Sequence, residues 1–575
     1  MGFRSAQDRA LANALFWPYV FSIVKTLNVL TLPALVSRSV ESFPDLPAFA
    51  FVGGQSMTFA DCDLTVRETS RKLSGLGVTR GDRVAILSEN MPNWAVAYLA
   101  TTTMGAVAVP ILPDFTEVEL ANIIEHAGVR LIFVSRRLAP KIAELKNLTK
   151  ITLDDFSGLP EADAAAPATA DASDSVGNPT EDDLAAIIYT SGTTGNSKGV
   201  MLTHKNIVSN VEAARPIAEM VPGECMVSIL PLSHTYECTI GMLVPFSAGV
   251  SVYYLEKPPS PTVLMPALEK IKPHLMLSVP LFIEKIYRAR VAPKLQGSPV
   301  LRVACKVPPL RKILHRAAGK KVMAVFGGRL HFFGIGGAAV APDVEQFMRD
   351  AGFPYAVGYG LTETAPLLAG CGPSDTVFRS TGPALEGVEI RVAQPDPDTG
   401  EGEIQARGPN IMRGYYRDDE RTTETFTEDG WFRTGDLGTI DERGRVFIKG
   451  RLKNMILGPN GENIYPEEIE AVINAKPLVD DSLVMQKESE LIALVNLNID
   501  SFKEYLGEMS ANVTDEVDRL RAEAEVFLGD LRDKVNAELR SYSRITRFIP
   551  QIEPFEKTPT MKIKRYLYES RHGAT

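Results

Sequence analysis

The amino-acid sequence predicts a multidomain α/β protein, and three observations support this fold class. From about residue 45 to 370, short apolar runs alternate with segments of helical pattern, which is typical of βαβ units and parallel sheets. From 386 to 449 the pattern changes to short alternating strands with glycine turns, as in a small β-barrel or meander. After Gly450, a charged segment with helix-spaced apolar residues indicates a separate α+β module.

The N-terminal segment is apolar, and residues 10–37 carry a single charge, Lys25. Polar residues and prolines such as Asn13 and Pro18 interrupt this run, so we predict neither a transmembrane helix nor a signal peptide. Two alternatives stay open, an apolar helix packed on the body and an interfacial anchor at a membrane surface.

The region between residues 45 and 370 contains five apolar runs that we expect to be buried strands. They are Val84 to Leu87, Leu131 to Val134, Ala185 to Tyr189, Leu275 to Val279 and Leu330 to Ile335. Residues 157–183 are poor in large apolar side chains and rich in alanine and aspartate, so we expect an exposed linker. The helix-spaced series in the C-terminal module is Val517, Leu520, Ala524, Phe527, Leu531, Val535 and Leu539.

Composition and charge exclude several classes of protein. The 575 residues are 45% hydrophobic and 23% charged, as in globular enzymes, and leave room for several domain-sized cores. The net charge of −10 argues against a surface committed to nucleic acid, so we expect no nucleic-acid partner. The five cysteines include no C-x-x-C pair and suggest neither a disulfide framework nor a structural zinc site. We therefore expect a cytoplasmic protein.

The segment Tyr189 to Gly199 is the most informative part of the sequence. It reads YTSGTTGNSKG and follows an apolar run that we expect to be a strand. Its glycines allow backbone N–H groups to converge on an anion, its hydroxyls add donors, and Lys198 adds positive charge. The segment is therefore suited to bind a triphosphate. It is not a Walker A loop, because Lys198 stands between Ser197 and Gly199.

This segment resembles the signature loop of the AMP-forming adenylate ligases, which include the acyl-CoA synthetases, firefly luciferase and the adenylation domains of peptide synthetases. The resemblance extends over residues 31–569, because further signatures follow in the order of that family. They are PLSHTYE (231–237), Gly336-Gly337-Ala338, YGLTET (359–364), the run from Gly402 through Tyr416, WFRTGD (431–436), KGRLK (449–453), GENIYP (461–466) and TPTMK (558–562).

The resemblance implies a fold and a division into domains. It implies a large N-terminal domain over 31–450, with two doubly wound α/β subdomains and a β-barrel part at 386–449. An apolar extension, 1–30, precedes this domain, and a small mobile α+β domain, 451–575, follows it. Lys453 is the implied hinge between the two half-reactions.

The resemblance also implies an ATP site. The residues that it assigns to nucleotide binding are Thr190, Ser191, Gly192, Thr193, Thr194, Gly195, Lys198, Gly336, Gly337, Ala338, Tyr359, Gly360, Asp436 and Arg451. Tyr359 offers a ring face to adenine, and Asp436 can accept hydrogen bonds from the ribose hydroxyls. Arg451 can bind the same sugar or a phosphate. Glu363 is the implied ligand of Mg²⁺, whose other ligands are mainly ATP phosphates.

Four residues are implied in catalysis: Lys562, Thr362, Glu363 and His234. Lys562 can lower the barrier when a carboxylate approaches the α-phosphate, because both groups are negative. Met561 replaces the glycine that is common before this lysine, and this variant resembles the long-chain branch of the family. His234 lies where the family closes the acyl pocket. The tryptophan gate of some long-chain enzymes is not matched, since Cys238 stands four residues after His234.

A basic stretch runs from Lys285 to Arg329, with twelve Lys or Arg residues and no Asp or Glu. Three interpretations stay open, a solvated basic face, a site for CoA phosphates and a contact with anionic lipid head groups at the inner face of a membrane.

The sequence thus predicts an ATP-dependent long-chain fatty acid–CoA ligase with the substrates fatty acid, ATP and CoA. An acyl-AMP ligase that serves a carrier protein and a CoA ligase for a shorter or aromatic acid are alternatives within the family. A non-catalytic nucleotide- or lipid-binding relative is the alternative from another class. The oligomeric state stays open, a dimer included.

Overall fold

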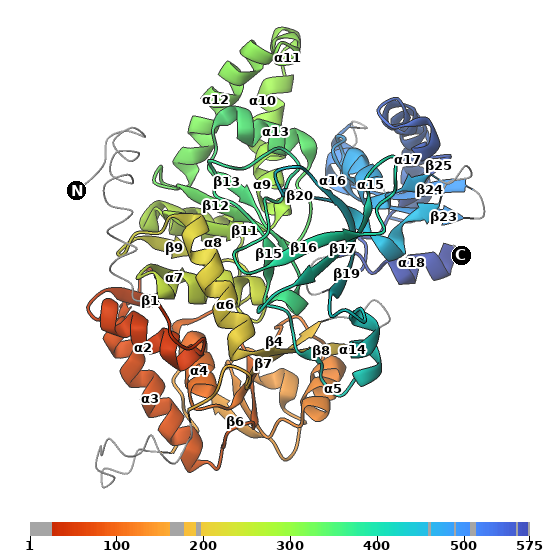
Figure 1. Cartoon of the computed structure of the whole chain (residues 1–575). Helices are drawn as coiled ribbons and strands as arrows, with labels where there is room; N and C mark the ends of the chain where they lie inside the picture. The colour runs from red at the N-terminus through yellow and green to blue at the C-terminus, as the bar shows by residue number, and fades with distance from the viewer. Residues whose placement is uncertain are drawn as a thin grey trace.

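The computed structural model describes residues 26–160, 178–190, 197–457, 462–487, 490–505, 513–558 and 562–572. The fold is mixed α/β, as predicted (Figure 1). Most of the expected linker, residues 161–177, lies outside the described residues, as do residues 1–25 of the apolar N-terminus. Across the described ranges we find no helix that is both long enough and apolar enough to span a bilayer.

Two seven-stranded sheets form the body. The first has the order β18-β8-β7-β4-β3-β5-β6. Its strands are β3 (Arg83–Leu87), β4 (Val107–Ile111), β5 (Leu131–Val134), β6 (Thr149–Thr152), β7 (Leu184–Thr190), β8 (Lys198–Thr203) and β18 (Gly414–Tyr415). The second has the order β13-β12-β11-β9-β10-β1-β2. Its strands are β1 (Pro47–Phe51), β2 (Met57–Thr58), β9 (Cys225–Val227), β10 (Ser251–Tyr254), β11 (Leu275–Ser278), β12 (Phe332–Ile335) and β13 (Tyr355–Val357).

All five predicted strands are present, and their pairing is largely parallel. The exception concerns the signature loop. β7 and β8, which flank the signature segment, pair antiparallel, with Thr190 opposite Lys198. Residues 191–196 between them lie outside the described residues. No helix N-terminus follows this loop directly, in contrast to phosphate loops of the strand-loop-helix type.

Helices cover both faces of each large sheet, as the doubly wound architecture requires. The helices of the body are α2 (Leu32–Ser42), α3 (Phe59–Gly75), α4 (Pro92–Thr103), α5 (Glu117–Ala127), α6 (His204–Ala214), α7 (Val244–Ser247), α8 (Pro261–Ile271), α9 (Pro280–Ile286), α10 (Ala292–Gln296), α11 (Pro299–Lys306), α12 (Pro308–Val325), α13 (Pro342–Ala351) and α14 (Asp419–Thr425). A π-helix, η4 (Tyr236–Leu243), runs directly into α7.

The main core lies between the two large sheets and includes side chains from α2, α3, α4, α6 and α7. Trp94 and Tyr98 of α4 stack at its centre and are buried. Phe49 of β1 stacks on Phe246 of α7. Burial of one such aromatic side chain contributes roughly 1.5–3 kcal/mol, so this core fixes the two sheets relative to each other.

The segment predicted as a barrel or meander is a four-stranded antiparallel sheet. Its order is β16-β17-β19-β20, and every pair of neighbours is antiparallel, as in a meander. The strands are β16 (Glu389–Ala393), β17 (Gly402–Arg407), β19 (Phe432–Ile440) and β20 (Val446–Arg451). Two short hairpins flank this region, β14 (Tyr359–Gly360) with β15 (Leu367–Ala369) and β21 (Ile456–Leu457) with β22 (Asn463–Ile464).

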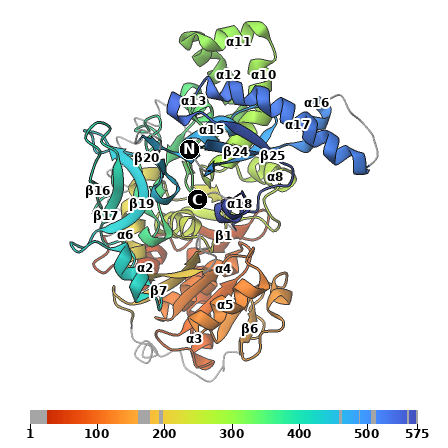
Figure 2. The same ribbon diagram turned by 90° about the vertical axis from the view of Figure 1, so that its right-hand side faces the viewer.

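The C-terminal module has its own three-stranded sheet, β23 (Val479–Lys487), β24 (Glu490–Leu497) and β25 (Arg547–Gln551). Its helices are α15 (Pro466–Asn474), α16 (Ile499–Tyr505), α17 (Val513–Asn536) and α18 (Arg565–His572). In α17, Ala524, Leu531 and Val535 of the predicted apolar series are buried against this sheet. Figure 2 shows α17, β25 and α18 on the face turned toward the viewer.

The module contacts the body at several points. The Tyr465 hydroxyl donates a 2.5 Å hydrogen bond to Glu401, and Lys449 of the body lies 4.0 Å from Glu468 of the module. Arg288 donates to the carbonyl of Ala475 at 3.4 Å. The site described below therefore has walls from both parts of the chain.

Candidate active site

Lys198, Glu363 and Tyr415 form a closed triangle of hydrogen bonds. The Lys198 Nζ donates to Glu363 Oε1 at 2.8 Å and to the Tyr415 hydroxyl at 2.7 Å, and that hydroxyl donates to Glu363 Oε1 at 2.8 Å. Lys198 begins β8, Glu363 lies in the short helix η6 (Thr362–Thr364), and Tyr415 lies in β18, which pairs with β8. Strand pairing thus brings the signature lysine to the glutamate of the YGLTET motif.

Buried amide side chains hold the backbone around Glu363. The Met412 N–H donates to the Glu363 carbonyl at 2.8 Å, and Asn410 Nδ2 donates to the Thr364 carbonyl at 2.9 Å. Asn206 of α6 donates to the carbonyls on both sides of Asn410, those of Pro409 and Ile411, at 2.8 Å each. The helix that follows β8 therefore also fixes the loop beside Glu363.

Glu363 is buried and ionised. Burial acts to raise the pKa of its carboxyl, but the Lys198 charge and the hydrogen bonds outweigh burial and hold the pKa below its usual value. Both side-chain hydrogen bonds end on Oε1, so Oε2 can still take a hard cation. No cluster of three metal-ligating side chains occurs among the described residues. This donor set fits Mg²⁺ that takes most of its ligands from nucleotide phosphates.

Asp436 lies at the centre of a second cluster. Tyr359 donates its hydroxyl proton to Asp436 Oδ2 at 2.8 Å, and Arg451 Nε lies 2.8 Å from Asp436 Oδ1. Asp436 and Arg451 face each other across β19 and β20, so the sheet register sets this ion pair. Burial raises the pKa of Asp436, although the Arg451 charge opposes this shift.

The glycine motifs leave room for close backbone approach. A Cβ on Gly360 would lie 1.8 Å from the Pro366 carbonyl oxygen, so only glycine fits this position. A Cβ on Gly336 would lie 3.1 Å from the Tyr236 ring. Gly337 has a φ of +88° and is exposed, as is Ala338. These residues directly follow β12, and Gly336 packs closely on the Tyr236 ring.

A buried polar network holds the segment that carries His234. Asn90 Nδ2 donates to the Leu230 carbonyl at 2.6 Å and to Ser228 Oγ at 2.9 Å, and Asn90 Oδ1 accepts from the Leu232 N–H at 2.8 Å. The Ser228 hydroxyl donates to Glu237 Oε1 at 2.5 Å. This chain of bonds fixes both ends of the PLSHTYE segment.

Two groups in this segment have strongly shifted pKa values. Burial, followed by the positive charge of Lys562, lowers the pKa of His234 to about 4, so the imidazole is neutral at pH 7. Burial raises the pKa of Glu237 to about 8. Its second oxygen, Oε2, is buried without a hydrogen-bond partner in the described structure. Glu237 therefore folds in its protonated form.

Lys562 of the C-terminal module faces the clusters of the body. Its charge acts on Asp436, Glu363 and His234. Although the residue is exposed, the protein atoms around its ammonium group and then the Arg451 charge lower the pKa of Lys562. The Lys562 backbone is held by two bonds with Thr558, at 3.2 Å and 2.7 Å.

The junction between the two parts lies beside these clusters. Lys453 is exposed and belongs to the short helix η7 (Leu452–Asn454), directly after Arg451. Partial burial of its ammonium group, and then the positive charges of Arg451 and Lys198, lower the pKa of Lys453. Further on, the GENIYP signature begins at Gly461, which lies outside the described residues, contains β22 and ends at Pro466, the first residue of α15.

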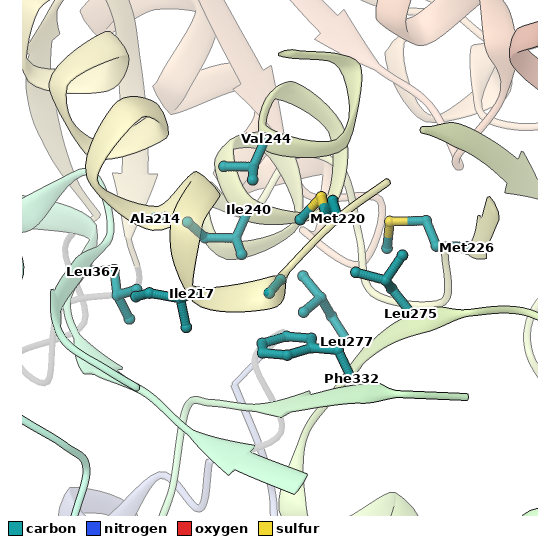
Figure 3. A pocket seen from close by; sticks show the side chains of 11 residues that line it. Ala214, Ile217, Met220, Met226, Ile240, Val244, Leu275, Leu277, Phe332 and Leu367 are labelled. Carbon is teal, nitrogen blue, oxygen red and sulfur yellow. The ribbon is translucent and has the colours of Figure 1, made fainter. Parts of the chain in front are cut away.

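An apolar cavity of about 40 Å³ lies between the second large sheet and the helices α6, η4 and α7 (Figure 3). Its lining residues are Ala214, Ile217, Ala218, Met220, Met226, Ile240, Val244, Leu275, Leu277, Phe332 and Leu367. Ile240 belongs to the π-helix after His234, and Leu367 follows the YGLTET motif closely. Two of its lining residues therefore lie close in sequence to candidate site motifs.

The structure brings together most of the residues that the sequence singled out. The charges of Glu363, Asp436, Arg451 and Lys562 act on one another, and Lys198 acts on Glu363. Thr190 ends β7 with its hydroxyl buried and without a partner among the described residues. Ser191, Gly192, Thr193, Thr194 and Gly195 lie outside the described residues.

Sequence analysis missed three site residues. Tyr415 lies inside the motif run from Gly402 to Tyr416 but gave no signal of its own. Asn90 and Ser228 lie outside every motif, and their partners become visible only when the strands are assembled. Ser228 directly follows the apolar strand β9 and Asn90 comes three residues after β3, and these positions near strand ends were the available hint.

Comparison with known proteins shows the family to which this fold and site belong. The AMP-binding enzyme family matches residues 36–416, about two thirds of the chain, including the segments of Lys198, His234 and Glu363. The chain belongs to the AMP-binding enzyme family. Its C-terminal module, with Lys562, lies beyond the matched residues.

Curated relatives cover nearly the whole of this AMP-binding enzyme. It is 29% identical over 559 residues to the long-chain-fatty-acid–CoA ligase FadD15 of Mycobacterium bovis, with 88% of this chain and 90% of that protein covered. It is 31% identical over 493 residues to 4-coumarate–CoA ligase 2 of Oryza sativa subsp. japonica, with 79% and 80% covered.

Solved structures share its fold over almost its full length. ATP-bound MatB from Rhodopseudomonas palustris aligns with a TM-score of 0.73 and 25% identity, covering 94% of this chain and 99% of that one. A fatty acyl CoA synthetase from Mycobacterium tuberculosis aligns with a TM-score of 0.64 over 94% and 98%, and its 22% identity supports the fold alone.

Proposed function

We propose that this AMP-binding enzyme is an ATP-dependent long-chain fatty acid–CoA ligase. The protein is an AMP-forming acid–CoA ligase, in line with the activities named for its curated relatives. The observation that carries the proposal is the meeting of Lys562 with Glu363, Asp436 and His234 between the two parts of the chain. The positive charge of Lys562 lies there beside Glu363 and Asp436, two carboxylates that could bind Mg²⁺ and the ribose of a nucleotide.

In the first half-reaction, a carboxylate oxygen of the acid attacks the α-phosphorus of ATP and pyrophosphate leaves. Lys198, with residues of the signature loop, would bind the β- and γ-phosphates, and Asp436 would bind the ribose. Lys562 would offset the repulsion between the two anions as they approach. Glu363 would hold Mg²⁺, which supplies charge neutralisation on the phosphates when bound.

In the second half-reaction, the CoA sulfur attacks the carbonyl carbon of the acyl-AMP and AMP leaves with the bonding electron pair. The thiol proton is released to solvent or base. The mixed anhydride makes AMP a good leaving group, so the reaction requires no nucleophile from the protein. Rotation of the C-terminal module about Lys453 would replace Lys562 at the site and admit CoA.

The apolar cavity supports a hydrocarbon substrate. All eleven lining residues are apolar, and the π-helix after His234 forms one wall. A volume of about 40 Å³ is much smaller than a long acyl chain, so binding requires side chains to move. Met220 and Met226, which are flexible, are suited to such movement.

Two rival activities belong to the same family, and one of them has specific support. The similarity to 4-coumarate–CoA ligases supports an aromatic acid. An acyl-AMP ligase that serves a carrier protein would share the first half-reaction. The KTPTMK ending and the uninterrupted passage from Gly450 to Lys453 favour CoA as the acceptor.

A panel of acids scored by pyrophosphate release tests the substrate. Saturated and monounsaturated acids of roughly twelve to eighteen carbons should exceed acetate and benzoate in kcat/KM, because each buried CH₂ contributes about 0.8 kcal/mol. Ile217→Trp, which fills the cavity, should reduce kcat/KM for the long acids and leave that for acetate unchanged. Val118→Trp on the exposed surface is the matched control. A highest kcat/KM with benzoate or acetate would overturn the long-chain assignment.

A further inference from the structure

The helices α11 and α12 form a projection from the body that the active site does not use. In Figures 1 and 2, α11 lies at the top of the molecule, beyond the other labelled elements. None of the eight residues of α11 is buried, and α12 buries only His315, Gly319 and Val322. The outer sides of both helices therefore face solvent.

The projection is anchored firmly along its inner side. Arg311 donates a 2.7 Å hydrogen bond to the buried carboxylate of Asp350, and His315 lies 3.2 Å from the same group. Gly319 packs so closely on α13 that an added Cβ would lie 2.6 Å from the Ala351 Cβ. The exposed side of α12 is thus held in a fixed orientation.

Large apolar side chains gather on the exposed side. Val300, Val303, Val307, Leu310 and Ile313 are 75%, 64%, 43%, 47% and 62% exposed. Val300 and Val303 are three residues apart in α11, and Leu310 and Ile313 are three residues apart in α12, so each pair lies on one helix face. Val307 lies at the junction of the two helices. Other exposed apolar residues, such as Leu64 and Val118, lie singly on the body, as is usual for globular proteins. These five side chains, gathered within residues 300–313, form an exposed apolar patch of the kind that marks a contact surface.

Basic side chains surround this patch. The stretch from Lys285 to Arg329 has twelve Lys or Arg residues and no acidic residue, in a chain of net charge −10. Arg288 and Arg311 form ion pairs with residues of α13. Seven other basic residues on and beside α11 and α12 are exposed and form no ion pair with the described residues. They are Lys294, Arg302, Lys306, Lys312, Arg316, Lys320 and Lys321.

We propose that α11 and the first half of α12 dock onto the surface of an anionic lipid bilayer. A bilayer interface presents phosphate anions and hydrocarbon at nearly the same depth, which matches basic side chains that surround exposed valines, leucine and isoleucine. In an isologous contact with a second copy, this basic patch would face itself, and the like charges would repel. Nucleic acid would leave the apolar residues without a partner. The proposal does not depend on the acid that the enzyme activates.

Flotation of the full chain with lipid vesicles tests the proposal. One set of vesicles contains phosphatidylcholine alone, and in the other set phosphatidylglycerol replaces part of it. The protein should float with the anionic vesicles and remain unbound with the neutral ones. High salt should weaken binding because it screens the charges. Equal binding to both sets, or binding to neither, would overturn the proposal.

Two triple variants and two matched controls locate the surface. K306Q/K312Q/R316Q should reduce partitioning onto anionic vesicles about a hundredfold, since each basic residue contributes roughly a fivefold increase. V300S/V303S/I313S should reduce it at least about tenfold. The controls R71Q/K146Q/R443Q and L64S/V118S/V526S change exposed residues of the same kinds elsewhere. They should change binding less than about twofold.

Other outcomes would assign the binding elsewhere. Unchanged binding in both triple variants would place the contact in another part of the chain, residues 1–25 included, and overturn the proposal. Loss of self-association in V300S/V303S/I313S without an effect on flotation would assign the patch to a second copy. An unchanged Tm in each variant shows that a loss of binding does not come from unfolding.

Discussion

Lys198 donates a 2.8 Å hydrogen bond to Glu363, a residue 165 positions further along the chain. This pair joins the first large sheet to the loop before the four-stranded sheet, and Tyr415 bonds to both partners. The pair therefore couples the candidate phosphate-binding segment to the candidate ligand of Mg²⁺, and its removal should affect both stability and chemistry.

Lys198→Met should reduce acid-dependent pyrophosphate release about a hundredfold, because a charge aimed at the phosphates is lost. It should also destabilise the fold, since Glu363 is left buried without its ion pair. In the native protein the lowered pKa of Glu363 contributes stability above its unfolded pKa, and this contribution is lost as pH falls toward the folded pKa. The variant should lack that pH dependence in Tm. Lys205→Met, which removes an exposed lysine 3.7 Å from Glu181, is the control and should be nearly normal.

Lys562→Ala should lose adenylation far more than thioester formation. Its charge is needed while two anions approach, whereas the thiol attacks an activated carbonyl. Supplying synthetic acyl-AMP together with CoA separates the two steps. Lys564→Ala, two residues further on, should be nearly normal in both. An equal loss of both steps in Lys562→Ala would give Lys562 a structural role.

Lys453→Pro should retain much of its acid-dependent pyrophosphate release while thioester formation falls by orders of magnitude. Proline fixes φ near −65°, so a torsion change at this residue could no longer exchange one conformation for the other. Lys453→Ala should be nearly normal in both steps. If a folded Lys453→Pro protein loses both half-reactions in parallel, domain alternation about this residue is wrong.

Compared with the native protein, the Glu237→Gln variant should gain stability on going from pH 5 to pH 8. The pKa of Glu237 is raised to about 8 by burial, so the folded state holds its proton over a range in which the unfolded chain has lost it. Native stability from this group is therefore fully present below the unfolded pKa, near 4.5, and is lost as pH rises toward 8. Glutamine keeps the shape and does not titrate. Tm measured against pH should fall less steeply in the variant, and parallel curves would show that Glu237 is ionised in the fold.

The sequence was sufficient for the fold class, and it singled out several residues that the structure places together, for identifiable physical reasons. The strands that contain Val84, Leu131 and Ala185 are buried on both faces, so the sequence shows them as short continuous apolar runs. Such runs are readily recognised as buried strands. Lys198 and Glu363 belong to motifs whose residue types alone suggest phosphate and metal binding. Side-chain chemistry of that kind is visible without a structure.

Other features depend on pairings between distant segments and could not be predicted. β7 and β8, which flank the signature segment, pair antiparallel, although an apolar run looks the same in either direction. Asn90 becomes important only because it bonds to Leu230 and Leu232, about 140 residues away. The protonated state of Glu237 depends on complete burial, which no local pattern indicates.

The most direct test of the account is a reaction of the enzyme with a long-chain acid and ATP, first without CoA and then with CoA added. The account predicts that pyrophosphate appears only when the acid is present, that acyl-AMP stays bound without CoA, and that added CoA yields the thioester and AMP. Release of ADP and phosphate, or pyrophosphate release that does not depend on the acid, would contradict it.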